Sequence, residues 1–310
     1  MPTAKNIAPQ VGYLPVAISN VYLVGEPGGS GPWALVDTGI PNRFEWIKAA
    51  CDKRFGKDAR PEAIVLTHGH FDHSGSALAL ATYWDVPVYV HSLEVPYVTG
   101  KMTYPPPDPT VGGAMAFASR FFPPNRADLE DRVRTLPDDG SVPGMPDWKW
   151  HATPGHSPGH VSLFRETDRC LIAGDAVITT NVDKLVDFLT KRQELGRPPA
   201  PVTCDWPAAR RSLMRLADLR PYTLACGHGL PLAGPEVAGA LRAFAEDFIA
   251  PLHGRYVPEP AETDESGIVY LPPPVPDPLP KVAAAVGAVA LVVGIGLAAA
   301  SRRKTKDENV

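Results

Sequence analysis

The segment Ile64–Ser76, with the sequence IVLTHGHFDHSGS, is the feature that most constrains what this chain can fold into. It places His68, His70, Asp72 and His73 within six positions that directly follow an apolar, strand-like run. Because side chains two residues apart in an extended segment point the same way, His68 and His70 can face one point, while Asp72 and His73 can face a second. Imidazole and carboxylate together suit zinc, iron or manganese better than calcium or magnesium. The segment therefore predicts a metal site at the end of a strand, with histidines kept for hydrogen bonding in the core as the alternative.

Strands and helices are expected to alternate along most of the chain. Apolar periodicity and turn residues predict strands over 14–36, a helix over 43–55, a strand over 62–67, a helix over 76–84 and a strand over 87–91. Further strands are expected within 148–177, and a helix over Asp205–Leu219, where Asp205 can cap the first turn and Pro207 suits it. A short strand near 222–229 and a helix over 235–249 complete the pattern. This alternation predicts an α/β architecture.

Three further candidates for metal binding follow other strand-like runs. His156 lies in TPGHSPGH, Asp175 in LIAGDAV and His228 in ACGHGLP. Proteins of the α/β class collect their functional groups at the C-terminal ends of strands, which is where all three residues are expected. Together with the first cluster, the chain offers five histidines and two aspartates, enough for two metal ions that share one carboxylate.

The motifs THGHFDH, GHSPGH, AGDA and CGHG, preceded by LVDTG, resemble those of the metallo-β-lactamase superfamily in its glyoxalase II-like branch. The resemblance extends over roughly residues 14–250 and implies a four-layer αββα sandwich with the site between the edges of its two sheets. It also implies a role for each candidate residue. His68, His70 and His156 would hold a first metal ion, Asp72, His73 and His228 a second, Asp175 would bridge both, and Asp37 of LVDTG would orient ligands by hydrogen bonds.

The chemistry implied by this resemblance is hydrolysis at an acyl carbon. Two divalent ions are expected, zinc first, with manganese or iron as alternatives, and a metal-bridging hydroxide would attack a thioester, a lactone or another activated ester. Asp72 would have a catalytic role as the proton shuttle to the leaving group. Asp175 stands where the best-known lactamases use cysteine, which disfavours penicillins, and no segment matches the glutathione-binding part of glyoxalase II.

Two other functions stay open at this point. Persulfide dioxygenases of the same superfamily hold a single iron ion with residues that correspond to His68, His156 and Asp175. A non-catalytic, membrane-anchored scaffold that keeps zinc for folding is the other alternative, although structural zinc sites are normally closed and rich in cysteine.

Residues 100–127 interrupt the alternation with proline runs and an apolar stretch, and we expect them to form a lid-like insert. Tyr97 and Tyr104 flank this insert and are candidate substrate contacts, with simple packing as the alternative. His160 is expected to begin a strand rather than to bind metal. The insert and its surroundings are therefore the expected source of substrate recognition.

The metallo-hydrolase domain is expected to span residues 1–252. Proline- and acid-rich residues 253–281 predict an extended linker, and the uncharged residues 282–300 predict a single transmembrane helix before a basic tail at 301–310. The tail favours a cytoplasmic C-terminus, whereas the lack of an N-terminal signal peptide favours a cytoplasmic catalytic domain. We expect a single-pass membrane protein with its catalytic domain in the cytoplasm.

Composition limits the partners of the chain. Its formal net charge of -4 gives no basic surface, so nucleic acid is not expected. A small-molecule acyl substrate and, through the C-terminal helix, a membrane are the expected partners. The four cysteines show no CxxC spacing, which is typical of free thiols in a reducing compartment.

Overall fold

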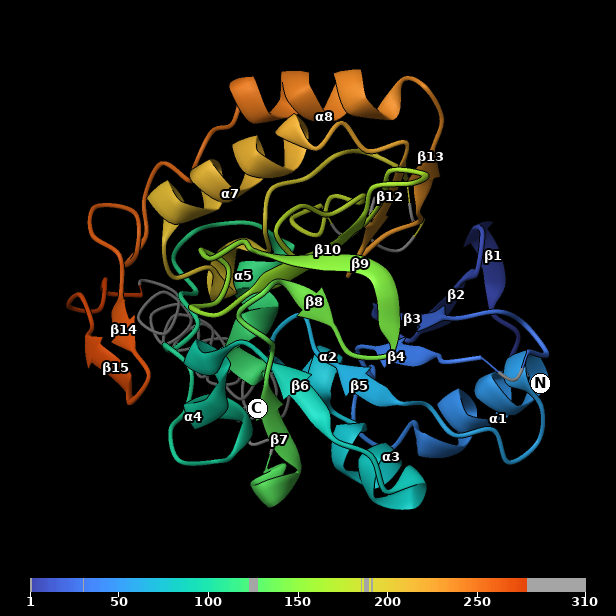
Figure 1. Ribbon diagram of the computed structural model, residues 1–310. Coiled ribbons are helices and arrows are strands. Elements are labelled where there is room, and N and C mark those ends of the chain that lie inside the picture. The colour runs from blue at the N-terminus through green and yellow to red at the C-terminus, as the bar shows by residue number, and fades with distance from the viewer. Residues whose placement is uncertain are drawn as a thin grey trace, which may run out of the picture. The chain divides into compact units, whose positions relative to one another are not determined.

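The strands of the described residues form two sheets and a separate hairpin (Figure 1). The computed structural model describes residues 2–29, 31–122, 128–184, 186, 190 and 192–277. Consecutive strands are neighbours in the first sheet, which contains β1 (Lys5–Ala8), β2 (Val11–Val16), β3 (Ser19–Val24), β4 (Ala34–Val36), β5 (Ala63–Val65), β6 (Val88–Val90) and β7 (Val133–Thr135). Strands β1 to β4 pair antiparallel and β4 to β7 pair parallel, because longer crossover segments connect the parallel strands.

The second sheet has the strand order β13–β12–β11–β10–β9–β8. Its strands are β8 (Ser141–Val142), β9 (Met145–Ala152), β10 (Val161–Arg165), β11 (Cys170–Gly174), β12 (Thr223–Cys226) and β13 (Leu232–Ala233). Strands β11 and β12 pair parallel, with Gly174 opposite Cys226. Asp175 and His228, which follow these two strands, therefore emerge at the same edge of the sheet.

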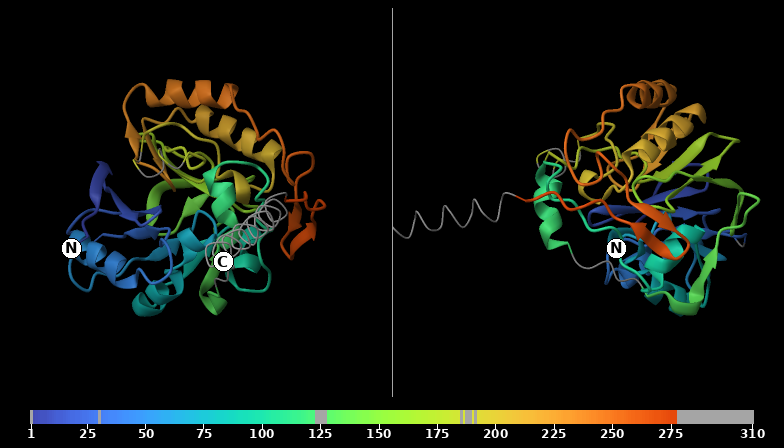
Figure 2. Two further views of the ribbon diagram at one scale, coloured as in Figure 1. Left: turned by 180° about the vertical axis from the view of Figure 1, so that it is seen from behind. Right: turned by 90° about the vertical axis from the view of Figure 1, so that its left-hand side faces the viewer.

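Helices cover the outer face of each sheet (Figures 1 and 2). Helices α1 (Phe44–Phe55) and α3 (Ala77–Trp84) pack on the first sheet, and α7 (Trp206–Asp218) and α8 (Val237–Glu246) pack on the second. Helix α7 begins as predicted, because Asp205 accepts a hydrogen bond from the Ala208 N–H at 2.8 Å and Pro207 lies in the first turn. Shorter helices are α2 (Phe71–Ser74), α4 (Val95–Val98) and α5 (Ala114–Ala118), with 3₁₀ turns at Ser92–Glu94, Ser119–Phe121, Glu130–Arg132 and Ala200–Val202.

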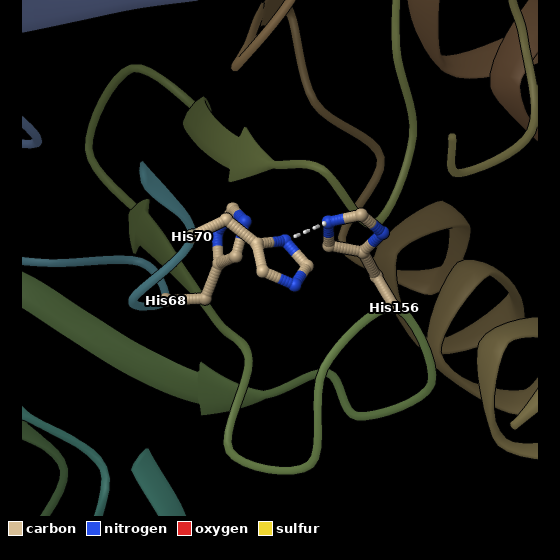
Figure 3. Close-up of side chains that lie close together, drawn as sticks. All are labelled: His68, His70 and His156. Atoms are coloured by element: carbon tan, nitrogen blue, oxygen red, sulfur yellow. Dashed lines mark hydrogen bonds between the residues drawn. The ribbon is translucent and has the colours of Figure 1, made fainter. Parts of the chain in front are cut away.

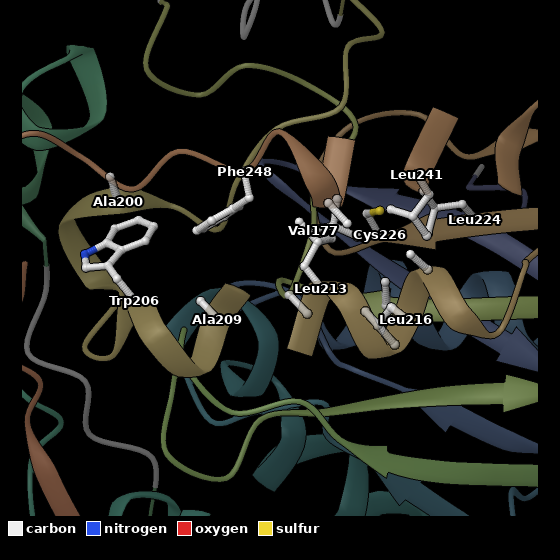
Figure 4. Packing of buried hydrophobic residues seen from close by; sticks show 14 of the residues in the cluster. Val177, Ala200, Trp206, Ala209, Leu213, Leu216, Leu224, Cys226, Leu241 and Phe248 are labelled. Atoms are coloured by element: carbon white, nitrogen blue, oxygen red, sulfur yellow. The ribbon is translucent and has the colours of Figure 1, made fainter. Parts of the chain in front are cut away.

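Three clusters of buried apolar residues hold these layers together. One joins α1 and α3 to the first sheet and includes Ile47 and Leu80. Another fills the space between the two sheets and includes Trp148. The third joins α7 and α8 to the second sheet through residues such as Leu213 and Leu241 (Figure 4). Strand β5 is buried at every position, as expected for a strand between two apolar layers. The predicted α/β fold, a four-layer αββα sandwich, is confirmed.

The chain departs from the expected linker directly after residue 252. The compact unit continues to Pro273, and within it β14 (Glu262–Asp264) pairs with β15 (Gly267–Tyr270). Tyr256 is 2% exposed and belongs to the apolar cluster under α7 and α8. Proline and acidic residues are frequent in this segment, but its aromatic and aliphatic side chains supply packing that an extended linker lacks. Residues 253–273 are therefore not the extended linker that the sequence predicts.

The insert at 100–127 is more regular than its composition predicts. It contains α5 and a 3₁₀ turn, and both Tyr104 and Asp108 are buried in it, while residues 123–127 lie outside the described part of the chain. The expected transmembrane helix at 282–300 and the basic tail at 301–310 also lie outside it. Among the helices that the structure describes, none combines the length and the apolar character needed to span a bilayer.

Candidate metal centre

His68 and His70 lie in the loop after β5, and both rings approach His156 (Figure 3). His70 Nδ1 lies 3.0 Å from His156 Nε2. The ring centroid of His68 lies 4.7 Å from that of His70 and 4.8 Å from that of His156. His156 comes from the loop between β9 and β10, so the two sheets each contribute to this group. We call these three histidines the first donor set.

A second donor set, Asp72, His73 and His228, lies beside the first. Asp72 and His73 belong to α2, and His228 follows β12. Asp72 Oδ2 lies 3.5 Å from His228 Nε2 and 3.8 Å from His73 Nε2. Asp175 lies between the two sets, with carboxylate oxygens 3.5 Å from His156 Nε2, 3.6 Å from His73 Nε2 and 3.0 Å from His228 Nε2. All seven predicted ligands therefore come together, and groups of three offer donor atoms within 4.8 Å of one another.

Several donor atoms of this cluster have no hydrogen-bond partner among the described residues. These buried atoms are Nε2 of His68, His73 and His228 and Oδ1 of Asp175. A buried polar atom left without a partner costs about 1–3 kcal/mol, so four of them in one place need a cause beyond packing. Cations bound between them would satisfy all four. Five imidazoles and two carboxylates without a thiolate fit zinc, iron or manganese.

Burial and nearby carboxylates shift the pKa values of the histidines at this site in opposite directions. Burial lowers the pKa of His70 to about 4, so its imidazole is neutral at pH 7 and can offer a lone pair to a metal ion. Burial would also lower the pKa of His228, but the carboxylate of Asp175 outweighs it and raises that pKa to about 9. The same competition, between burial and the carboxylates of Asp175 and Asp72, raises the pKa of His73 well above its ordinary value. Positive charge is favoured where the carboxylates gather, which is the condition for binding a cation.

Asp37 of the LVDTG motif orients His73. Its Oδ2 accepts a hydrogen bond from His73 Nδ1 at 2.8 Å, and its Oδ1 accepts one from the Thr67 N–H at 2.8 Å. The N–H and hydroxyl of Thr38 both donate to the carbonyl oxygen of His73, at 2.6 and 2.8 Å. With Nδ1 held by Asp37, Nε2 faces the cluster and can bind a metal ion once its proton is released, which is the contact expected of Asp37.

The Asp37→Asn variant is expected to bind the metal ion at His73 about 10- to 100-fold more weakly. Asparagine keeps the shape of the side chain but loses the negative charge, and its amide N–H can face Nδ1 and reverse the tautomer. Calorimetric titration of the metal-free protein with zinc measures the change, with Asp138→Asn in an exposed loop as the matched control. Equal zinc affinity in both variants would contradict this role.

His160 supports Asp175 without joining the donor sets. It directly precedes β10, as the sequence predicts. Its Nε2 accepts a hydrogen bond from the Asp175 N–H at 2.9 Å, and its Nδ1 donates to Thr153 Oγ1 at 2.8 Å. The ring therefore holds the backbone of the shared carboxylate, a role that its place at the start of a strand does not indicate.

Glu94 is a functional residue that the sequence analysis missed. It is 0% exposed and ends the 3₁₀ turn after β6. It accepts hydrogen bonds from the Gly69 N–H at 2.9 Å, the Gly159 N–H at 2.7 Å, the Ser157 hydroxyl at 2.8 Å and the Tyr104 hydroxyl. Gly69 lies between the two histidines of the loop after β5, and Ser157 and Gly159 follow His156 in the loop between β9 and β10. The Glu94 carboxylate therefore connects both loops of the first donor set. The signal in the sequence is slight: an acidic residue within the mostly apolar run SLEVPYV.

A cavity of about 300 Å³ opens beside the donor sets. Asp72 and Asp175 reach its wall, together with three of the five histidines. Most of the remaining wall is apolar and includes Ile18, Phe71, Met115, Phe122, Val202 and the run Pro105–Pro107. The cavity therefore joins a polar, metal-binding end to an apolar end.

Tyr104 lines this cavity, whereas Tyr97 is not among the described residues that do so. The Tyr104 hydroxyl donates to Glu94 and accepts a hydrogen bond from the Gly69 N–H at 2.9 Å. Tyr97 is 1% exposed and stacks on Tyr104 with ring centroids 4.2 Å apart. The buried, stacked ring of Tyr97 agrees with the packing alternative, and a substrate contact through either tyrosine stays a prediction.

Comparison with known proteins agrees with this geometry. The family model described as the metallo-beta-lactamase superfamily matches residues 14–228, more than half of the chain. The chain belongs to the metallo-beta-lactamase superfamily. The match covers the first and second donor sets, Asp37 and Asp175.

Relatives in the metallo-beta-lactamase superfamily support a metal-dependent hydrolase at the family level. The probable metallo-hydrolase YflN of Bacillus subtilis (strain 168) is 46% identical over 233 residues, which cover 75% of this chain and 88% of YflN. The solved structure of TTHA1623 in a di-iron-bound form is 27% identical, with a TM-score of 0.52 over 80% of this chain and 100% of that chain. The metallo-beta-lactamase family protein TTHA1429 from Thermus thermophilus is 26% identical, with a TM-score of 0.52 over 78% and 81% of the two chains. These matches do not distinguish branches, so the glyoxalase II-like branch stays a prediction.

Proposed function

We propose that this chain is a dinuclear metal-dependent hydrolase that cleaves a thioester, a lactone or another activated ester. The observation that carries the proposal is the position of Asp175, which lies 3.5 Å from His156 in the first donor set and 3.0 Å from His228 in the second. A carboxylate shared by two sets of donors, with Nε2 of His68, His73 and His228 lacking a hydrogen-bond partner among the described residues, favours two metal ions over one. The relative YflN, named a probable metallo-hydrolase, supports the reaction class.

Each donor set would hold one ion. His68, His70 and His156 would bind the first, Asp72, His73 and His228 the second, and Asp175 both. When bound, the ions would polarise the substrate carbonyl and lower the pKa of a coordinated water. Zinc suits this mixture of imidazole and carboxylate, with manganese and iron as alternatives, and TTHA1623 has been solved in a di-iron-bound form.

The residues of the chain itself would supply orientation and proton transfer. Asp72 lines the cavity, so its carboxylate can take the proton of the attacking water and return it to the leaving group. His228 Nδ1 donates to the Ile18 carbonyl oxygen at 2.8 Å, which leaves its Nε2 for the site. Asp37 does the same for His73. These contacts orient both rings with Nε2 toward the site, and metal binding would displace the proton that the raised pKa values of His73 and His228 favour on Nε2.

Two rival functions make different predictions. A persulfide dioxygenase would need a single iron ion on His68, His156 and Asp175, which leaves the second donor set without a purpose. A non-catalytic zinc scaffold is disfavoured because the donors line a cavity, whereas structural zinc sites are closed and rich in cysteine. The four cysteines of the chain are buried free thiols outside the donor sets.

Elemental analysis of the full chain is expected to find about two metal ions per chain. Chelation should abolish hydrolysis across a panel of thioesters and lactones, and added zinc should restore it, because both donor sets need their ions for the reaction. One iron ion per chain with oxygen uptake on glutathione persulfide would favour the dioxygenase instead. Bound metal without either activity would favour the scaffold.

The cellular setting also remains a proposal. We propose a small acyl substrate as the partner of the cavity. Membrane attachment through residues 282–300, with the catalytic domain in the cytoplasm, stays a prediction because those residues lie outside the described part of the chain.

A further inference from the structure

Residues 254–270, which we call the C-terminal strap, reach back to the insert beside the cavity. The Tyr256 hydroxyl donates to the Pro106 carbonyl oxygen at 2.8 Å. The Arg255 N–H donates to Asp108 Oδ2. Two hydrogen bonds from adjacent residues of the strap therefore hold one short segment of the insert.

These contacts are buried and specific. Tyr256 is 2% exposed and Asp108 is 3% exposed. The other carboxylate oxygen of Asp108 accepts hydrogen bonds from the Thr110 N–H at 2.9 Å and the Thr110 hydroxyl at 2.6 Å. Gly254 has φ +140°, and a Cβ there would lie 2.7 Å from Asp108 Oδ2, so glycine is required for this close approach. The strap therefore packs directly against the insert.

The segment held by the strap forms part of the apolar wall of the cavity. Pro105, Pro106 and Pro107 all line it. Among the described residues of the lining, none is Lys or Arg, and every carboxylate belongs to the metal centre. An apolar wall without counter-charges disfavours an ionised group, because burying an unpaired charge is costly. This wall fits an uncharged hydrocarbon group better than a charged one.

We propose that the strap is a specificity element that, through Tyr256, holds the proline wall so that the cavity selects an uncharged hydrocarbon acyl chain. Tyr256 is a positioning residue, because it acts on the substrate through Pro106. The strap lies beyond residues 14–228, which the family model covers. The turnover part of this inference rests on the proposed hydrolase function, whereas the binding part does not.

A series of uncharged thioesters tests the substrate class on the full chain. Acetyl, butyryl, hexanoyl and octanoyl N-acetylcysteamine thioesters are expected to show kcat/KM rising about three- to four-fold per added methylene until the cavity is full. Succinyl thioester has the four carbons of butyryl but a terminal carboxylate, and is expected to be turned over at least about tenfold less well. Equal kcat/KM for succinyl and butyryl thioesters would overturn the proposal.

The Tyr256→Phe variant tests the strap itself. It keeps the buried ring and removes the hydroxyl, so KM for the octanoyl thioester is expected to rise about 3- to 10-fold, with kcat, the KM for the acetyl thioester and the metal content unchanged. Hydrogen exchange at the Asp108 amide should become faster. Tyr270→Phe is the matched control, because Tyr270 lies in the same strap but donates to the exposed Glu259. An equal loss for every chain length would mean a merely structural role and would overturn the proposal.

Measurements of product binding test the role of the strap independently of the proposed hydrolase function. Straight-chain carboxylic acids, the products of the reaction, are titrated into the full chain by calorimetry. If no thioester is hydrolysed but affinity rises with chain length and falls in Tyr256→Phe, the proposed function fails and the role of the strap stands. If thioesters are hydrolysed but neither KM nor affinity depends on chain length, the function stands and the role of the strap fails.

Discussion

The His68→Ala variant is expected to lose metal from the first donor set and at least about a thousand-fold in kcat/KM. His68 Nε2 is buried and lacks a hydrogen-bond partner among the described residues, and its ring lies 4.2 Å from that of His73 and 4.8 Å from that of His156. Its loss removes a ligand from the centre of the cluster. A bound metal ion stabilises the transition state by several kcal/mol, and about 4 kcal/mol corresponds to about a thousand-fold in rate.

Elemental analysis and kcat/KM on the best thioester measure the effect of His68→Ala, and circular dichroism checks that the fold persists. His253→Ala is the matched control, because His253 is exposed and lies outside the donor sets. The control should keep the metal content and activity of the wild type. Full metal content and wild-type turnover in His68→Ala would rule out the assigned first donor set.

The Glu94→Ala variant is expected to lower the free energy of unfolding by about 2–6 kcal/mol, because the Gly159 N–H and the Ser157 hydroxyl lose their acceptor and each unpaired buried donor costs about 1–3 kcal/mol. Tm should fall by at least about 4 °C for a domain of this size. Metal affinity should fall about 10- to 100-fold, as is typical when residues that support metal ligands are removed. Thermal unfolding with and without zinc, combined with zinc titration, measures both effects.

Two milder variants are expected to lose less stability than Glu94→Ala. Tyr104→Phe removes one of the four donors and leaves the carboxylate with three, so its loss of stability should be smaller than that of Glu94→Ala. Glu94→Gln keeps one acceptor oxygen but turns an amide N–H toward other donors, so it should fall between them. A Glu94→Ala protein that unfolds at the wild-type temperature and binds zinc equally well would show that the two loops do not depend on this carboxylate.

The architecture and the candidate donor residues could be predicted because both leave a local pattern in the sequence, whereas the division of the donors into two sets followed from the resemblance to the metallo-β-lactamase superfamily. Alternating strands and helices place their loops at predictable sheet edges, and the donors follow those strands directly. His156 and Asp175 were expected at strand ends, and the pairing of β11 with β12 brings Asp175 beside His228. Such positions follow from chain order and strand direction, without knowledge of side-chain packing.

Glu94, His160 and Tyr256 could not be predicted because their roles depend on tertiary contacts. Glu94 binds backbone N–H groups, which have no residue-specific signature in a sequence. His160 likewise accepts a hydrogen bond from a backbone group, the Asp175 N–H, so no sequence pattern identifies its role. Tyr256 lies in a segment whose proline- and acid-rich composition is also typical of linkers. The hydrogen bond from its buried side chain to the Pro106 carbonyl oxygen distinguishes this segment from a linker.

The division of the donors between the two sheets has a consequence for biosynthesis. His68 to His73 emerge early from the ribosome, whereas Asp175 and His228 are translated much later. The proposed dinuclear centre can therefore be completed only after His228 has left the exit tunnel and the second sheet has closed on the first. A nascent chain that stalls earlier would expose histidines without a partner sheet. Metal loading would then mark the end of folding rather than guide its start.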